Sequence, residues 1–179
     1  MIRFMNNWKV AHLEELVEFT NGGAWKASEY VDEGIPVVRV SDIHNGTIIL
    51  DKCKYLPQES LKKYMKNVIS QGDLIITTVG SHPTQPGSVV GRSAIVPKSA
   101  HGALLNQNAV KITSVNLGLE QEYLAYLGKS QLFRNFIKSR ARGSANQVRI
   151  AISELSKMEI PIPPLYIQRK IADILSAYD

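Results

Sequence analysis

The stretch DLIITTV at Asp73–Val79 predicts a β-strand, the first of three consecutive strands in the middle of the chain. Its apolar and β-branched residues are typical of strands. The second strand is predicted at Val89–Val96 (VVGRSAIV), and the third at Ala103–Ile112. Residues 80–88, between the first two, contain two prolines and two glycines and therefore predict an exposed loop.

The sequence N-terminal to these strands predicts shorter elements. Leu13–Phe19 has apolar residues at helical spacing and predicts a short helix. Four elements are then expected in order: a strand at Pro36–Val40, a hairpin turn at Asn45–Gly46, a return strand at Thr47–Leu50 and a short helix from Ser60 to Asn67.

The C-terminal part predicts mainly helices. Glu120–Ser139 has the apolar pattern of two consecutive helices, Gly143–Gln147 is expected to be a polar loop, and Met158–Ile162 is expected to be a brief strand. Pro164 is well placed to start a last helix, whose face is formed by Leu165, Gln168, Ile171, Ile174 and Leu175. A short amphipathic helix is marginal unless it packs on something. It either folds back on its own domain or begins a longer helix, and we favour the second.

Composition describes an ordinary globular chain of 179 residues, of which 44% are hydrophobic and 21% charged. The single cysteine, Cys53, allows neither an intrachain disulfide nor a cysteine-based zinc site. No targeting segment and no run of about 20 apolar residues is visible. We therefore expect a cytoplasmic protein without a membrane partner.

The charge of +5 is unevenly distributed along the chain. Residues 1–73 carry a net −1, residues 74–153 carry +7, and residues 154–179 carry −1. The middle part has only two acidic residues, Glu120 and Glu122. Such a block of one sign is typical of a surface that meets a polyanion, most simply nucleic acid, although a basic surface that only maintains solubility is the alternative.

The sequence offers no constellation for catalysis. The four histidines have no metal-ligand spacing, and no Walker A, G-x-G-x-x-G or G-x-S-x-G motif occurs. Glu120 and Glu122 lie two residues apart on a predicted helix and therefore point to different faces, unlike the clustered carboxylates of a metal-dependent nuclease. We predict a binding protein without an active site or a metal of its own.

The basic middle also contains the side chains that read DNA. Phosphates are bound by cations, and base edges are read by amides and guanidiniums. Asn106, Gln107 and Asn108 lie within the third predicted strand, and Asn146 and Gln147 lie within the polar loop. Each amide alone is more often structural, but together with the charge block they favour a groove reader.

The order of motifs resembles the target recognition domain of the specificity (S) subunit of type I restriction–modification systems. The match covers essentially the whole chain, and the closing segment, IPIPPL-x-x-Q-x-x-I-x-x-x-L, makes the series specific. The motifs in chain order are Trp8-Lys9-Val10; Gly34–Ile43; Gly72–Ile76; Val90-Gly91-Arg92; Asn106-Gln107-Asn108; Gly143-Ser144 with Gln147; and Ile160–Leu165 followed by Gln168, Ile171 and Leu175.

The resemblance implies sequence-specific recognition of double-stranded DNA, with one domain reading one half of a bipartite site. It implies as partners the methyltransferase (M) subunits, the restriction (R) motor-nuclease subunits, and a second recognition domain or a second copy of this chain. S-adenosylmethionine, ATP and magnesium would be cofactors of those partners, and none is expected in this chain. The alternatives are a recognition domain cut from a fused methyltransferase–nuclease enzyme and an unrelated nucleic-acid-binding module.

The resemblance also implies a fold and a division of the chain. The expected fold is α+β, with an irregular curved β-sheet region and a small helical part. Residues 1–162 would form the recognition domain, and residues 163–179 would begin a spacer helix that stops early. The chain could be an isolated domain, a truncated gene product or a half-subunit, and the sequence does not decide among these.

Carried onto this sequence, the resemblance and the charge pattern assign three sets of residues. The base-reading candidates are Arg39, Ser41, Thr78, Ser81, His82, Gln85, Gln107, Asn108, Ser144, Asn146 and Gln147. The phosphate-binding candidates are Arg92, Lys138, Arg140, Arg142 and Arg149. Leu165, Ile171 and Leu175 are expected to face a partner.

Overall fold

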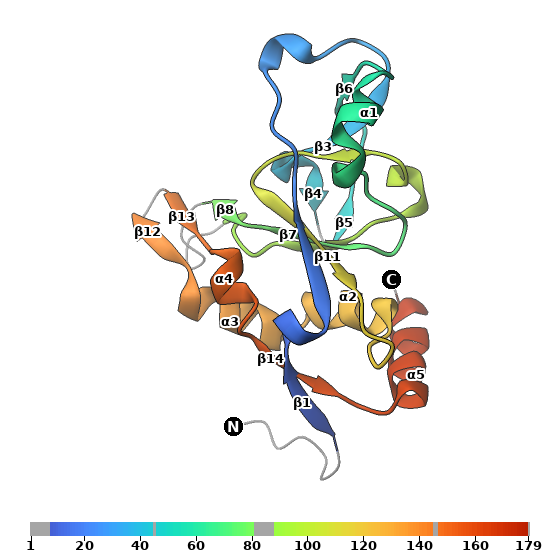
Figure 1. Ribbon diagram of the computed structural model, residues 1–179, viewed down its shortest axis with the longest axis vertical. Coiled ribbons are helices and arrows are strands. Elements are labelled where there is room, and N and C mark those ends of the chain that lie inside the picture. The colour runs from blue at the N-terminus through green and yellow to red at the C-terminus, as the bar shows by residue number, and fades with distance from the viewer. Residues whose placement is uncertain (1–7, 45, 81–87, 145–146, 179) are drawn as a thin grey trace.

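The computed structural model describes residues 8–44, 46–80, 88–144 and 147–178, with the backbone alone described for Ser144. Its centre is a four-stranded antiparallel sheet in the order β2-β11-β7-β9 (Figure 1). The strand predicted from Asp73 is confirmed as β7. The sheet comprises β2 (Val17–Asn21), β7 (Leu74–Thr77), β9 (Ser93–Ile95) and β11 (Ala109–Ser114).

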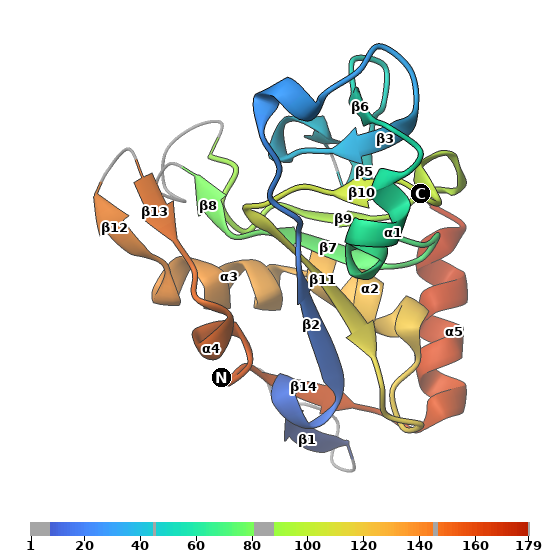
Figure 2. The ribbon, with the colours of Figure 1, turned by 45° about the horizontal axis from the view of Figure 1, so that its top comes forward.

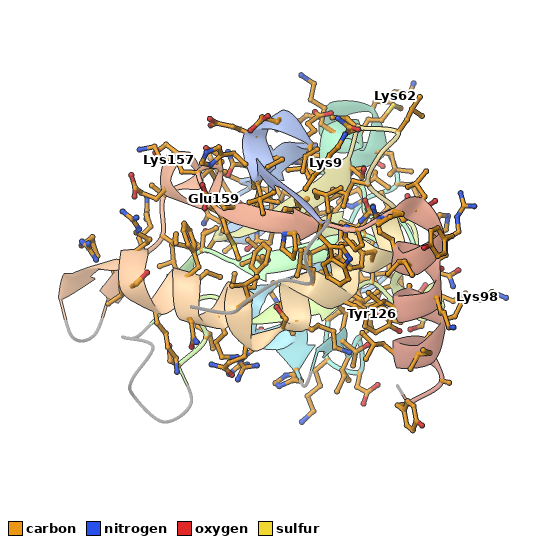
Figure 3. The ribbon with its side chains drawn as sticks, turned by 90° about the horizontal axis from the view of Figure 1, so that it is seen from below. Lys9, Lys62, Lys98, Tyr126, Lys157 and Glu159 are labelled. Carbon is orange, nitrogen blue, oxygen red and sulfur yellow. The ribbon has the colours of Figure 1, made fainter. Side chains whose placement is uncertain are left out.

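β7 is buried on both faces and separates two hydrophobic cores, and a smaller third cluster of the described residues includes Val37 and Leu104. Side chains alternate along a strand, so Leu74 and Ile76 join one cluster while Ile75 joins another. The first core is covered by helices: seen from below, α3 and α2 run along the sheet and α5 lies beside α2 (Figure 3). The helices at this end are α2 (Gln121–Lys129), α3 (Gln131–Arg140), α4 (Ile152–Leu155) and α5 (Leu165–Ser176).

Short strands cover the other face of the sheet and extend the molecule beyond it (Figure 2). One sheet has the order β10-β3-β6, and a separate hairpin pairs β4 with β5. These elements are β3 (Ile35–Val38), β4 (Ile43–His44), β5 (Thr47–Ile48), β6 (Lys54–Leu56), β10 (Leu104–Leu105), α1 (Ser60–Tyr64) and the 3-10 turns at Ala27–Glu29, Val40–Asp42, Met65–Asn67 and Lys98–Ala100.

Two further pairings involve the late part of the chain. β1 (Lys9–His12) pairs antiparallel with β14 (Glu159–Ile162), so an early and a late segment form one ribbon. A third sheet has the order β12-β13-β8 and projects from one side of the molecule (Figure 1). Its strands are β8 (Val79–Gly80), β12 (Arg142–Ser144) and β13 (Gln147–Arg149). With these sheets and helices together, the fold is the expected mixture of α and β elements.

Gln168 fastens α5 to the domain. The side chain is fully buried, and its Oε1 accepts the backbone N–H of Glu120 at 2.9 Å. Its Nε2 donates to the carbonyl oxygens of Gly118 (2.8 Å) and Pro163 (2.7 Å). The glutamine of the closing motif therefore joins the start of α5 to the segment that leads into α2.

The packing of α5 differs from the apolar face that the sequence predicts. Ala172 is buried and Ile171 packs against the first core, whereas Leu175 is 42% exposed and Ile174 is 51% exposed. The helix thus packs on its own domain and still leaves an exposed apolar edge, and this packing is compatible with the start of a longer helix, which stays a prediction. Of the residues expected to face a partner, Ile171 points inward, Leu165 is half-buried and Leu175 is exposed.

Three local predictions are wrong. Leu13–Phe19 is not a helix: a 3-10 turn at Leu13–Glu15 leads into β2, because pairing with β11 outweighs the local apolar spacing. Residues 103–112 do not form one strand, since the chain bends at Asn108 (φ +71°) and divides them between two sheets. Of the polar loop expected at residues 143–147, Gly143 and Ser144 lie in β12 and Gln147 lies in β13, whereas residues 145 and 146 lie outside the described residues.

We predict that Gln168→Ala lowers the free energy of unfolding by about 3 kcal/mol, because it leaves a buried N–H and two carbonyl oxygens without their partner. Chemical denaturation measures this loss. Gln58→Ala is the control, since Gln58 is exposed, and should change stability by less than about 0.5 kcal/mol. Equal effects of the two substitutions would contradict the assigned role of Gln168.

Candidate nucleic-acid interface

The β12–β13 hairpin is held to the body of the domain through β8. Val148 on β13 is buried and lies opposite Gly143 on one side and Gly80 on the other. A Cβ at Gly143, whose φ is +143°, would lie 2.2 Å from the carbonyl oxygen of Gln147. A Cβ at Gly80 would lie 2.6 Å from the backbone nitrogen of Val90. Both glycines therefore permit backbone approaches that no other residue would allow.

The opposite face of the hairpin presents Arg142, Gln147 and Arg149, which we call the hairpin face. Arg142 and Arg149 are direct cross-strand partners, and Gln147 lies two residues from Arg149, on the same side. All three residues are exposed. Like charges directly opposite each other destabilise a hairpin, so this arrangement favours a surface that meets an anion.

Thr78 joins the hairpin to a second group of amides. Its N–H donates to the carbonyl oxygen of Asn108 (2.8 Å), and its carbonyl oxygen accepts the N–H of Ile150 (2.9 Å). The exposed Gln107 and Asn108 are thereby brought beside the end of β13. Asn106 has a structural role, because its amide donates to the carbonyl oxygen of Gly23 at 3.3 Å. The structure thus brings together Thr78, Gln107, Asn108 and the hairpin.

Arg39 and Ser41 are engaged within the chain. Arg39 donates from Nε and Nη2 to the two carboxylate oxygens of the buried Asp42, at 3.0 and 2.9 Å. The hydrogen bond to Asp42 raises the pKa of Arg39. The hydroxyl of Ser41 donates to the same carboxylate at 3.2 Å. A DNA contact by Arg39 would compete with this ion pair, so its predicted role and that of Ser41 stay predictions.

Four of the predicted base-reading positions cannot be placed. Ser81, His82, Gln85 and Asn146 lie outside the described residues, and the side chain of Ser144 does so too.

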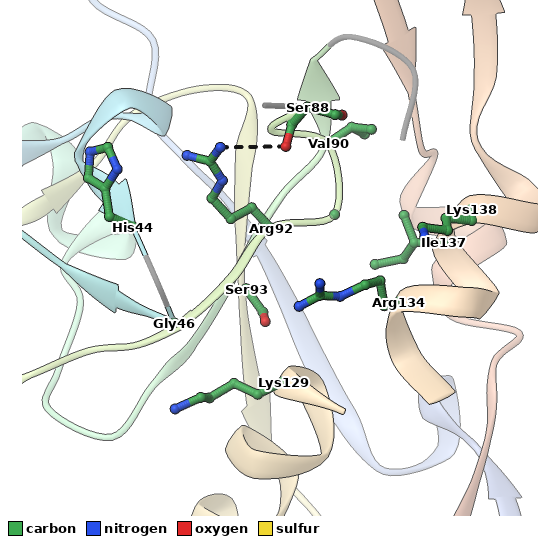
Figure 4. Close-up of a pocket in the computed structure, with 11 residues that line it drawn as sticks. His44, Gly46, Ser88, Val90, Arg92, Ser93, Lys129, Arg134, Ile137 and Lys138 are labelled. Atoms are coloured by element: carbon green, nitrogen blue, oxygen red, sulfur yellow. Dashed lines mark hydrogen bonds between the residues drawn. The ribbon is translucent and has the colours of Figure 1, made fainter. Parts of the chain in front are cut away.

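The five phosphate-binding candidates occupy three different settings. Arg142 and Arg149 belong to the hairpin face, and Arg142 also donates to the carbonyl oxygen of Ser139 at 2.9 Å. Arg140 lies 3.6 Å from the carboxylate of Glu154. Arg92 and Lys138 line a pocket beside α3 (Figure 4).

Glu154 is an acidic residue that lies beside the cations at the C-terminal end of α3. Lys157 donates to its carboxylate at 3.0 Å, which lowers the pKa of Glu154, and Arg140 and Arg142 lower that pKa further. Glu154 thus pairs with Arg140 and is also close enough to interact with the charge of Arg142 on the hairpin face.

The pocket also contains two cations that the sequence argument did not select, Lys129 and Arg134. Arg134 and Lys138 are four residues apart on α3 and therefore share one helix face. The four-residue spacing of Arg134 and Lys138 is the sequence signal that could have identified a basic helix face. Nothing in the sequence indicates that Arg92 lines the same pocket as these two residues.

The described residues offer no sign of a metal centre or a membrane span. Within them, no three His, Cys, Asp or Glu side chains come together in a way that could hold a metal ion. Helices in the same part of the chain are all too short or too polar to cross a membrane. A β-ribbon that presents cations and amides is instead typical of nucleic-acid-binding proteins.

Comparison with known proteins identifies the family. The model of the type I restriction modification DNA specificity domain matches residues 5–179, so the chain belongs to this family. A curated relative, the type I restriction enzyme MjaVIII specificity subunit of Methanocaldococcus jannaschii, is 25% identical over 173 residues, which cover 97% of this chain and 40% of that protein. The chain thus spans less than half the length of this relative.

Solved structures share the fold. A chain from a type I R-M system, studied for complex assembly and conformational transition, superposes with a TM-score of 0.68 at 20% identity, covering 98% of this chain and 39% of that one. The type I restriction-modification system S subunit from M. genitalium gives a TM-score of 0.66 at 19% identity, covering 100% and 41%. The α+β fold predicted from the family resemblance is thereby confirmed.

We predict that Gly143→Ala loosens the hairpin, because the added methyl group would meet the carbonyl oxygen of Gln147. Hydrogen exchange should become faster at the amides of β12 and β13, with little change in the central sheet. Gly102→Ala is the control, since Gly102 also has a positive φ (+84°) but a Cβ there meets nothing within 4 Å. Unchanged exchange in the Gly143→Ala hairpin would contradict the close approach.

Proposed function

We propose that this chain is a DNA-reading domain of a type I restriction–modification specificity subunit and recognises one half of a bipartite site in double-stranded DNA. The observation that carries the proposal is the hairpin face, where two arginines and a glutamine project together from a ribbon. The major groove of B-DNA admits a two-stranded β-ribbon, and amides and guanidiniums are the side chains that read base edges there. Family membership supports the same conclusion.

Within this function the residues divide by chemistry. Arg149 and Arg142 bind phosphates and fix the position of the hairpin, while Gln147, Gln107 and Asn108 read base edges. Thr78 keeps the two groups of amides together through its backbone hydrogen bonds. The chain itself is non-catalytic and directs the M and R subunits, which carry the cofactors, to its site.

The exposed edge of α5 suits assembly. Tyr166 (69% exposed), Ile174 and Leu175 leave apolar surface on the helix although Gln168 fastens it to the domain. In the proposed assembly residues 163–179 begin the spacer that separates two recognition domains and meets the M subunits, while residues 1–162 read DNA. A partner helix would cover this edge.

A selection from a random duplex pool tests the proposal. We expect the chain to enrich one short sequence motif, and we expect Gln147→Ala to relax the preference at particular base pairs by about 1–3 kcal/mol, the cost of losing a bidentate amide contact. Gln131→Ala, an exposed amide on α3, should leave the preference unchanged. The absence of any enriched motif would overturn the proposal.

Removal of a guanidinium from the hairpin face should act differently. Arg149→Gln is expected to weaken binding to all duplexes alike and to reduce the slope of log K against log salt by about one. Arg169→Gln, an exposed arginine on α5 that pairs with Glu120 at 2.7 Å, is the charge-matched control and should bind as the wild type does. If Arg149→Gln changed the preferred bases instead, the division of roles would be wrong.

A further inference from the structure

A pocket of about 450 Å³ lies between α3 and the loops at the edge of the central sheet (Figure 4). Its wall carries four permanent cations, Arg92, Lys129, Arg134 and Lys138, together with His44. None of the described residues that line it is acidic. We call it the basic pocket. In Figure 4, Arg134 extends from α3 toward Ser93, Lys129 runs below Ser93 toward the side where Gly46 lies, and Arg92 lies above Ser93.

The fold places these cations together by close backbone packing. Gly91 has a φ of +72°, and a Cβ there would lie 2.6 Å from Ile137 of α3. This glycine lets the segment before β9 approach α3, so that Arg92 and Arg134 line the same pocket. Arg92 is held in place because its Nη1 donates to the carbonyl oxygen of Ile43 at 2.9 Å.

A second close approach positions the lysine at the end of α2. A Cβ at Gly46, in the β4–β5 turn, would lie 2.8 Å from Cε of Lys129, so this side chain spans the pocket toward that turn. The pocket therefore has a cation on three separate parts of the fold: the segment before β9, the end of α2 and α3.

This concentration of charge is unfavourable in the absence of an anion. Like charges four residues apart on a helix, as at Arg134 and Lys138, destabilise it. An anion with several oxygen atoms would relieve the repulsion and accept hydrogen bonds from several cations at once. Ser93, which also lines the pocket, adds a hydroxyl donor suited to phosphate oxygens.

The position of the pocket indicates which phosphate it would bind. α3 carries Arg134 and Lys138 and ends at Arg140, and β12 begins at Arg142. The C-terminal end of α3 therefore connects the basic pocket to the hairpin face along the chain. We propose that the basic pocket holds a backbone phosphodiester of the same duplex whose bases the hairpin face reads. This inference rests on the proposed function.

Binding measured against salt tests the inference with the whole chain and two duplexes, one with the selected motif and one without it. Arg134→Gln and Lys138→Gln should each lower affinity about tenfold at low salt, equally for both duplexes, and reduce the salt slope by about one. Lys62→Gln on α1 is the control, because it removes the same charge from an exposed site. Circular dichroism checks that each variant is folded.

A scan of duplexes with one neutral methylphosphonate linkage locates the contact. At one position the neutral linkage should weaken the wild type about tenfold and leave Arg134→Gln unaffected, because the variant has already lost that contact. Three results would overturn the inference alone, provided that the wild type binds DNA. They are a scan with no such position, affinities of Arg134→Gln and Lys138→Gln equal to that of Lys62→Gln, and a change in these two variants of the affinity ratio between the two duplexes. Failure of the wild type to bind any duplex would overturn the proposed function as well.

Discussion

The burial of β7 on both faces is the constraint on which the rest of this structure depends. Leu74 and Ile76 require a cover of helices on one side, and Ile75 requires a layer of short strands on the other. Within its sheet β7 also lies between two neighbours, because β11 and β9 pair with its two edges. The chain leaves this fixed strand at Thr78, where hydrogen bonds to Asn108 and Ile150 connect it to two other segments. The candidate interface is thus anchored to the most buried part of the molecule.

The connection of other segments to β7 also explains how most of the cations of residues 74–153 come to lie together on the surface. Along the sequence the cations of residues 74–153 are dispersed over β11, α2, α3, β12 and β13, the segment before β9 and the 3-10 turn at Lys98–Ala100. In the structure β8 pairs with β13 of the hairpin, and Gly91 allows the segment with Arg92 to approach α3. Arg142 and Arg149 therefore lie on the hairpin face, and Arg92, Lys129, Arg134 and Lys138 line the basic pocket. Three cations belong to neither feature: Lys98, Lys111, which lies 4.0 Å from the carboxylate of Asp73, and Arg140, which pairs with Glu154. In the proposed complex the hairpin face reads bases through Gln147 and binds phosphates through its two arginines, and the basic pocket holds a further phosphate of the same duplex.

Much of the fold could be predicted from local sequence, and the errors have a common physical cause. Strong apolar periodicity or a proline stop correctly predicts five elements: β7, α2, α3, β14 and the start of α5. β2 was mistaken for a helix and residues 103–112 for one strand because their conformation depends on pairing with distant segments. The hairpin offers only Val148 as an apolar signal, and its pairing with β8 spans some seventy residues. The charge block and the amides were visible in the sequence, whereas the ion pair of Arg39 with Asp42 and the pocket around Arg92 required the structure.

The central claim is that this chain selects a DNA sequence for a restriction–modification assembly. A map of N6-methyladenine in a host that carries this gene with its partner genes tests it most directly. The account predicts a bipartite methylated motif that disappears when the gene is deleted and returns when the gene is restored. A methylation map that is the same with and without the gene would contradict it.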